Sequence, residues 1–392
     1  MKSLEKIKDL TENQCRVIDT LLKKGDITKN EIAEALDMKL TSLNNILYPM
    51  KEQGIVIETV QGQPNGGRRP TLYSINQNDY LVIGVDISIL YVKVILANIK
   101  MEILYKEDFG MDETCTPEKT MEQIAKIIKK IKKKFDSDGE RLLGVGIGTV
   151  GPLRAEDAVL LENQDFYAAG WKNVRLREML ESKIQDEVQV ANGVNCAALL
   201  EYLYGSGKNH KNIGYFNCGM GIRVGTIASD KIIRSLNDEE EAFSKMQLFL
   251  PTGKQKSNYI EDYITIKAIN RKYMELIPVD VSGGENSLPL FMKIVGEAEK
   301  EDGIARQVID EAAEIMGIGL SNFIRLLDID LIIMGGPLVR SCPRYYEKCA
   351  KVVAGNINDK KTQFEMLGKF GNDGIALGAA VMLVENLIGD SY

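Results

Sequence analysis

Residues 188–201 read Val-Gln-Val-Ala-Asn-Gly-Val-Asn-Cys-Ala-Ala-Leu-Leu-Glu, and Gly193 is the most informative residue in this stretch. Asn192, directly before it, can cap the start of a helix, and Glu201 can lie on the solvated face of that helix. Glycine has no side chain, so position 193 cannot accept a proton as a general base would. The stretch therefore predicts a helix start that lacks an acid–base group.

The N-terminal 75 residues show the spacing of three short helices. Apolar side chains recur at helical intervals over residues 11–22, and Gly25 ends that segment. Thr28 can cap a second helix, because Glu31 lies three residues further on and completes a capping box. A third helix begins near Leu40.

A hairpin pattern follows these helices. A strand starts at residues 55–57, a turn-rich tip covers residues 61–70, and residues 71–75 form an alternating return strand. Three helices followed by a hairpin predict a winged helix-turn-helix, in which the third helix enters the major groove of DNA. Pro49 lies inside this third helix and is expected to kink or shorten it.

Two groups of side chains are predicted to contact DNA. Polar residues lie on the third helix opposite its buried stripe and offer donors and acceptors to bases and phosphates: Lys39, Thr41, Ser42, Asn44, Asn45 and Tyr48. Arg68 and Arg69 lie at the tip of the wing, where arginine can enter a narrow minor groove.

Other interpretations of the N-terminal segment stay open. Winged domains sometimes bind only protein, and residues 1–80 hold eleven Lys and Arg against eleven Asp and Glu, so they have no overall basic footprint. The basic run at residues 126–134 has isoleucines on one helical face and lysines on the other. It predicts a solvated amphipathic helix rather than a nucleic-acid site.

The rest of the chain carries an ordered set of strand and glycine motifs. They are the strand ending at Asp86, Gly144–Pro152, Gly170–Val174, Gly219–Gly225, Leu331–Pro337 and Gly378–Ala380. Together with residues 188–201 they resemble the ROK family (repressors, open reading frames and sugar kinases) over nearly the whole chain. The resemblance implies an α/β fold in which an N-terminal winged helix-turn-helix precedes a two-lobed, actin-like or ribonuclease H-like body. We expect domains at residues 1–77 and 78–392, with lobe one at about 80–191 plus the helix 374–392, and lobe two at about 192–373.

The chain departs from the kinases of this family at two catalytic positions. The family's Asn-Asp pair, whose Asp is the general base, is Asn192-Gly193 here, and its Asp-x-Gly-Gly-Thr turn ends in Ser88, Ile89 and Leu90. We therefore predict a transcriptional regulator, most simply a repressor, with no catalytic residues and no cofactor. The alternatives are an active sugar kinase with an accessory DNA-binding domain and a ligand-independent dimerising scaffold.

The resemblance also implies where a small molecule would bind. The residues that match or replace the family's sugar-pocket positions are Asn163, Trp171, Asn192, Glu201 and Glu261. The family's structural zinc is not expected, because its three cysteine positions hold Thr252, Lys254 and Tyr259 and its histidine falls near Lys245. The expected effector is a sugar, a sugar derivative or another small molecule.

Composition sets the remaining expectations. A chain of 392 residues with 44% hydrophobic and 27% charged residues is typical of a folded multidomain protein. Its apolar runs are too short to span a membrane, it shows no signal peptide, and its six cysteines are dispersed. We expect a cytoplasmic homodimer, or a tetramer, whose two-fold symmetry matches a palindromic double-stranded DNA operator.

Overall fold

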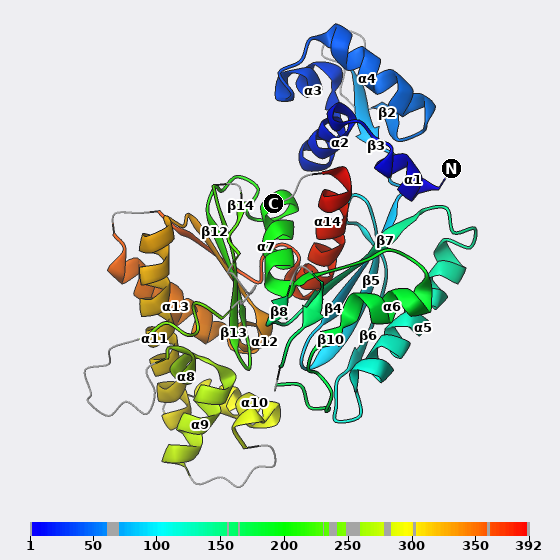
Figure 1. Ribbon diagram of the computed structural model, residues 1–392. Coiled ribbons are helices and arrows are strands. Elements are labelled where there is room, and N and C mark those ends of the chain that lie inside the picture. Colours follow the sequence, from blue (N-terminus) through cyan, green and yellow to red (C-terminus); the bar gives the residue numbers. More distant parts are fainter. Residues whose placement is uncertain are drawn as a thin grey trace. The chain divides into compact units, whose positions relative to one another are not determined.

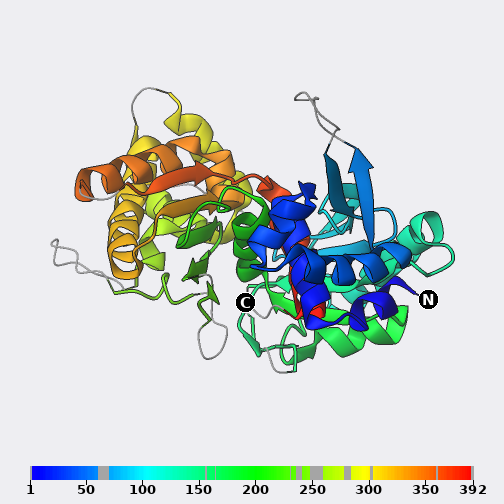
Figure 2. The same cartoon turned by 90° about the horizontal axis from the view of Figure 1, so that it is seen from above.

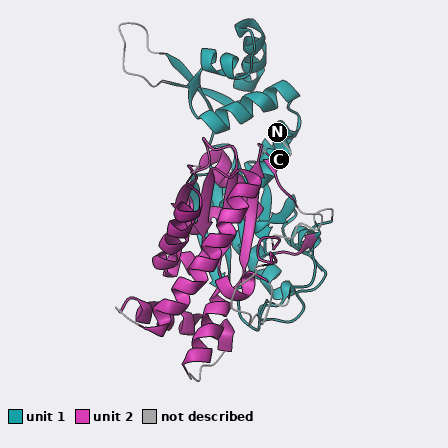
Figure 3. Cartoon of the chain, turned by 90° about the vertical axis from the view of Figure 1, so that its left-hand side faces the viewer, with its two compact units in different colours: residues 1–150, 154–193, 376–392 teal, residues 151–153, 194–375 magenta. Residues whose placement is uncertain are grey.

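The computed structural model describes residues 2–60, 70–154, 157–163, 165–229, 231–234, 241–247, 259–277, 284–300, 303–358 and 361–389. They form two compact units (Figure 3). Unit 1 comprises residues 1–150, 154–193 and 376–392, and unit 2 comprises residues 151–153 and 194–375. The winged helix and the first sheet of the body thus belong to the same unit.

The N-terminal segment is a winged helix-turn-helix, as the sequence predicts (Figure 1). Its helices are α1 (Ser3–Lys8), α2 (Glu12–Lys24), α3 (Lys29–Ala35) and α4 (Leu40–Glu52). Its strands β1 (Ile27–Thr28), β2 (Val56–Val60) and β3 (Thr71–Ile75) form an antiparallel sheet in the order β1-β3-β2. Figure 2 shows the blue helices beside strands β2 and β3. Helix α1 and strand β1 were not predicted.

Local side-chain contacts explain where these helices start. The Thr28 hydroxyl accepts the Glu31 backbone N–H at 3.3 Å, and the Glu31 carboxylate accepts the Thr28 backbone N–H at 2.7 Å. This reciprocal pair is the predicted capping box of α3. Of the two expected effects of Pro49, shortening does not occur, because α4 continues to Glu52. Its last turn is held by the buried Met50 and by the Gln53 N–H, which donates to the Pro49 carbonyl.

Unit 1 also contains a mixed five-stranded sheet in the order β11-β7-β4-β5-β6. Strands β4 (Leu81–Ile87), β5 (Tyr91–Asn98) and β6 (Ile103–Gly110) are antiparallel neighbours, whereas β7 (Leu142–Thr149) and β11 (Val188–Asn192) run parallel to β4. A smaller sheet contains β8 (Leu153–Arg154), β9 (Val159–Leu160) and β10 (Val174–Arg175).

The helices of unit 1 pack closely on this sheet. Helix α14 (Gly374–Ile388) approaches so near that a Cβ atom at Gly84 would lie 1.9 Å from the Ala376 carbonyl oxygen. Helix α5 (Pro117–Phe135) contacts β5 and α6 (Leu176–Ile184). The isoleucines of α5 are buried and most of its lysines are exposed, which confirms the predicted solvated amphipathic helix.

Unit 2 repeats the same strand topology. Its sheet has the order β14-β13-β12-β15-β16, in which β12 (Ile213–Cys218), β13 (Ile222–Ala228) and β14 (Lys231–Ile232) are antiparallel. Strands β15 (Leu331–Gly335) and β16 (Gln363–Met366) run parallel to β12. Two sheets of one topology are the predicted ribonuclease H-like, actin-like body.

The helical elements of unit 2 surround a large apolar core. They are α7 (Gly193–Tyr204), α8 (Glu261–Ile264), α9 (Ile266–Leu276), η1 (Gly284–Asn286), α10 (Leu288–Ala298), α11 (Ile304–Leu327), α12 (Gly336–Ser341), α13 (Pro343–Asn356) and η2 (Gly371–Asp373). Phe216, Phe243 and Phe323 meet edge to face in this core, with ring centroids 5.0–5.9 Å apart. Across the described parts of both units, the helices are too short or too polar to cross a lipid bilayer.

Candidate functional site

Helix α4 presents a continuous polar face to solvent. All six side chains predicted to contact DNA from this helix are exposed: Lys39, Thr41, Ser42, Asn44, Asn45 and Tyr48. Leu43, Leu47 and Met50 on the opposite side are at most 2% exposed. The helix is therefore anchored by its apolar stripe, and the polar face is free to meet another molecule.

Sequence reasoning missed two residues near this face, Leu40 and Lys29, whereas Tyr48 was predicted. Leu40, the first residue of α4, is 46% exposed, and Tyr48 is 68% exposed. They are the exposed large hydrophobic side chains among the described residues of the winged helix. Lys29 at the start of α3 donates from Nζ to Asn44 Oδ1 at 2.7 Å. That contact joins residues 15 positions apart, so no local pattern signals it.

The two wing arginines, Arg68 and Arg69, lie outside the described residues. The strands that lead to and from them, β2 and β3, are paired from Val56↔Ile75 to Val60↔Thr71. The ion pair between Lys51 Nζ and Glu58 Oε1, at 2.5 Å, connects α4 to β2. The hydrogen bond from Lys51 lowers the pKa of Glu58.

Three of the predicted ligand-site residues belong to unit 1. Trp171 is 3% exposed, stacks on Phe166 with ring centroids 4.1 Å apart, and donates from its indole N–H to the Cys115 carbonyl at 3.0 Å. The Asn163 N–H donates to the Trp171 carbonyl at 3.2 Å, so the structure brings these two residues together. Asn192 is 1% exposed at the end of β11.

The other two belong to unit 2. Glu201 is fully buried, and its carboxylate accepts the Ser206 N–H at 2.9 Å and the Phe370 N–H at 3.0 Å. A Cβ atom at Gly205 or Gly368 would lie within 2.4 Å of that carboxylate, so both loops need glycine there. Glu201 thus joins two loops through their backbone amides.

Glu261 begins α8 and is half-buried. Its backbone N–H donates to the Ser244 carbonyl at 3.0 Å. Burial raises the pKa of Glu261, and the nearby carboxylates of Glu241 and Asp262 raise it further, while a hydrogen bond from Ser244 opposes the shift. The charged form of this carboxyl group is therefore less favoured than that of an exposed carboxyl group.

The two turns that match the phosphate-binding segments of the family each contain an internal backbone hydrogen bond and a buried side chain. In the β4–β5 turn the Ser88 N–H donates to the Tyr91 carbonyl at 2.9 Å, and Ile89 is 6% exposed. In the β12–β13 turn the Gly219 N–H donates to the Gly221 carbonyl at 2.9 Å, and Arg223, 6% exposed, places Nη1 beside Gly221.

The segment that matches the zinc-binding segment of the family holds no cluster of metal-binding side chains among its described residues. Lys245 pairs with Glu241 at 3.0 Å and Tyr259 is exposed, while Thr252 and Lys254 lie outside the described residues. Elsewhere among the described residues, too, no group of three or more His, Cys, Asp or Glu side chains is placed to hold a metal ion.

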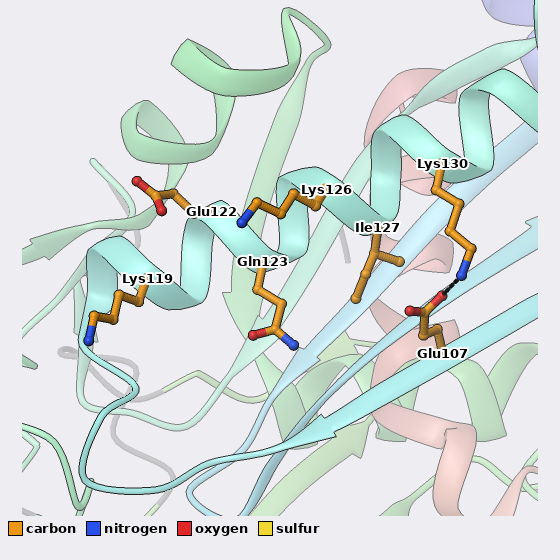
Figure 4. A pocket seen from close by; sticks show the side chains of 7 residues that line it. All are labelled: Glu107, Lys119, Glu122, Gln123, Lys126, Ile127 and Lys130. Atoms are coloured by element: carbon orange, nitrogen blue, oxygen red, sulfur yellow. Dashed lines mark hydrogen bonds and ion pairs between the residues drawn. The ribbon is translucent and has the colours of Figure 1, made fainter.

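A groove of about 420 Å³ runs between α5 and β6 (Figure 4). Glu107, Lys119, Glu122, Gln123, Lys126, Ile127 and Lys130 line it. Lys130 crosses the groove to Glu107, with an Nζ–Oε2 distance of 2.8 Å. None of the predicted site residues lies in this groove.

Matches to known protein families divide the chain into the same two parts, the winged helix and the body. The family model described as ROK family matches residues 82–386, and the model described as TFIIE alpha subunit matches residues 5–83. The xylose repressor of Caldicellulosiruptor bescii is 24% identical over 393 residues, which cover 96% of this chain and 96% of the repressor.

Two solved structures share the fold. A ROK family transcriptional regulator, homologous to the E. coli MLC protein, matches with a TM-score of 0.76 and 17% identity over 96% of each chain. A ROK family glucokinase from Streptomyces griseus, in complex with glucose and AMPPNP, matches with a TM-score of 0.60 and 22% identity. That match covers 77% of this chain and 98% of the glucokinase.

Proposed function

This chain belongs to the ROK family, and we propose that it is a DNA-binding transcriptional repressor with a catalytically inactive sugar-kinase-like body. The observation that carries the proposal is the exposed polar face of α4, which lies on a winged helix joined to a ROK body. The similarity to a xylose repressor over 96% of both chains supports it.

The proposed DNA contacts come from α4 and the wing. Lys39, Thr41, Ser42, Asn44, Asn45 and Tyr48 would meet base edges and phosphates in the major groove, and Arg68 and Arg69 would enter the minor groove. A cytoplasmic homodimer would place two such heads on a palindromic operator, because half-sites lie about one helical turn apart or a multiple of it.

The proposed effector is a sugar, and D-xylose is the first to test because a similar protein is named a xylose repressor. Asn163, Asn192 and Glu261 are the proposed contacts, with Trp171 and Glu201 shaping the loops around them. A sugar can change operator affinity only if it binds one arrangement of the protein more tightly than another. Calorimetry with D-xylose, followed by operator binding with and without the sugar, measures this coupling.

Catalytic inactivity is supported by residues at both positions where the chain departs from the kinases. Gly193 offers no proton acceptor, and the Ser88 N–H already donates to Tyr91 within its own turn. The rival function is a sugar kinase with an accessory DNA-binding domain. Sugar-dependent ATP hydrolysis well above that of Asp86→Ala would establish the rival and overturn inactivity.

Selection and sequencing of genomic fragments bound by the full-length protein tests the repressor proposal. Wild type should enrich a palindrome, and Lys39→Ala with Asn45→Ala should abolish the enrichment. The matched control is Gln123→Ala with Lys126→Ala, which removes one exposed amide and one exposed lysine from α5. Equal enrichment by both double variants would exclude α4 as the reading surface.

A further inference from the structure

Lys29 lies at an electrostatically unfavourable place in the winged helix. It is the first residue of α3, where the backbone N–H groups of the helix end carry partial positive charge. Acidic side chains suit this position, and Glu31 in the same turn follows that preference. Local helix stability therefore does not account for a lysine here.

The contacts of Lys29 lead away from its own helix. Its Nζ donates to Asn44 Oδ1 at 2.7 Å and lies 5.3 Å from the centroid of the Tyr73 ring on β3. The same ammonium helps to lower the pKa of Glu58 on β2, although the hydrogen bond from Lys51 is the largest cause. Lys29 thus lies over the Tyr73 ring of β3 while it reaches the recognition helix.

This contact decides which way the Asn44 amide points. A lysine ammonium only donates, so its partner must be the Asn44 oxygen, and the Asn44 NH₂ group remains for other partners. The ammonium has further N–H donors of its own. Asn44 is exposed on α4 and the half-buried Lys29 of α3 lies beside it, so the pair presents donors at this face.

Such a pair discriminates between the two purines. An asparagine reads adenine by accepting from N6 and donating to N7, but here the N6 amino group would lie beside the ammonium. Guanine offers two acceptors, O6 and N7, at the same edge. We propose that Lys29 is a positioning residue that turns Asn44 into a reader of guanine. This inference rests on the proposed DNA-binding function and adds the base that α4 prefers.

The test uses the full-length protein and selection from a randomised DNA library at one fixed salt concentration. Wild type should select guanine at one position of each half-site, and Asn44→Ala should lose that preference. Lys29→Met should shift the position toward adenine by about tenfold, because the freed amide can then accept and donate. Lys29→Met combined with Asn44→Ala should behave like Asn44→Ala alone.

Two controls separate positioning from a general loss of charge or fold. Lys24→Met removes one exposed lysine from the neighbouring α2 and should leave base preference unchanged. Replacing the selected guanine by 7-deazaguanine removes the N7 acceptor, which should weaken wild type about tenfold and Asn44→Ala very little. Thermal unfolding of each variant confirms that it is folded.

The outcomes distinguish this inference from the function on which it rests. If wild type selects no sequence, the proposed function fails and the inference fails with it. If wild type selects a palindrome but Lys29→Met keeps the wild-type preference, or Asn44→Ala changes nothing, only the inference is overturned. A loss of affinity without any change in base preference would assign the pair to phosphate binding instead.

Discussion

The polar side chains of the winged helix and those of the kinase-like body face different surroundings. On and beside α4 six polar residues are exposed, and a buried apolar stripe beneath them anchors the helix. In the body, Trp171 and Glu201 are at most 3% exposed and are bonded to backbone groups. A buried polar group that already has partners cannot leave them without a desolvation penalty. On α4, residues that match a DNA-binding motif are therefore exposed and available for contact. In the body, residues that match sugar-pocket positions also have a structural role, because they are buried and already bonded.

The largest expected effect comes from Glu201, which tests whether the body residues are structural. Glu201→Ala leaves the buried N–H groups of Ser206 and Phe370 without their carboxylate acceptor. We expect a loss of about 3 kcal/mol in the free energy of unfolding, measured by urea denaturation. The exposed Glu178→Ala is the matched control and should change the free energy of unfolding by less than about 0.5 kcal/mol. Near-normal stability with a lost sugar response would make Glu201 a ligand contact and weaken the comparison.

The next largest effect is expected for the two wing arginines. Replacing them tests whether the winged helix contacts DNA. Arg68→Ala with Arg69→Ala should weaken operator binding by roughly 10- to 100-fold, because two cationic contacts are lost. The slope of log K against log salt concentration should fall by roughly two for the pair. Fluorescence anisotropy at several salt concentrations measures both quantities, and sedimentation checks that the oligomeric state is unchanged. Unchanged affinity and slope would remove the wing from the interface.

A smaller effect is expected for Trp171, and it tests whether the buried polar groups of the body are structural. Trp171→Phe keeps a ring to stack on Phe166 but removes the N–H donor to the Cys115 carbonyl. We expect a loss of about 1–2 kcal/mol in the free energy of unfolding and no change in operator affinity of the folded protein. A normal melting temperature together with a weaker sugar affinity would instead place the indole in a ligand site.

The sequence predicted contacts between near neighbours and missed those between distant ones. The capping box of Thr28 and Glu31 and the buried stripe of α4 follow from helical spacing, and the structure contains both. The bonds from Lys29 to Asn44, from Trp171 to Cys115 and from Phe370 to Glu201 span 15, 56 and 169 positions. No local pattern encodes such pairs, because folding alone brings them together. Sequence could therefore propose candidate site residues without revealing which of them are already bonded.

Pro49 shows a different limit, because the general rule for proline in a helix did not lead to a shortened helix here. Proline cannot donate an N–H to the carbonyl of Asn45, four residues earlier, and this loss usually costs about 3 kcal/mol in a helix interior. Met50 is nevertheless fully buried, and the N–H groups of Gln53 and Ile55 donate to the carbonyls of Pro49 and Met50. Tertiary packing thus retains a final turn that propensity alone would exclude.

The smallest effect is expected for the Lys51–Glu58 ion pair. Removing this pair tests whether the polar contacts of the winged helix add to its stability. The two side chains are 38% and 41% exposed, so solvent screens them and the pair should contribute no more than about 0.5 kcal/mol. Their hydrogen bond lowers the pKa of Glu58 below 4.5 and raises the pKa of Lys51 above 10.5.

These two shifts fix the pH range in which the pair stabilises the fold. The contribution of Glu58 is present above its unfolded pKa and is lost as pH falls through the lowered folded pKa. The contribution of Lys51 is present below its unfolded pKa and is lost as pH rises through the raised folded pKa. Urea midpoints of Lys51→Met and wild type should therefore differ slightly at neutral pH and converge in acid, below the lowered pKa of Glu58. A difference that persists in acid would come from packing of the lysine stem, and one well above 1 kcal/mol at neutral pH would mean that polar residues of the winged helix are structural too.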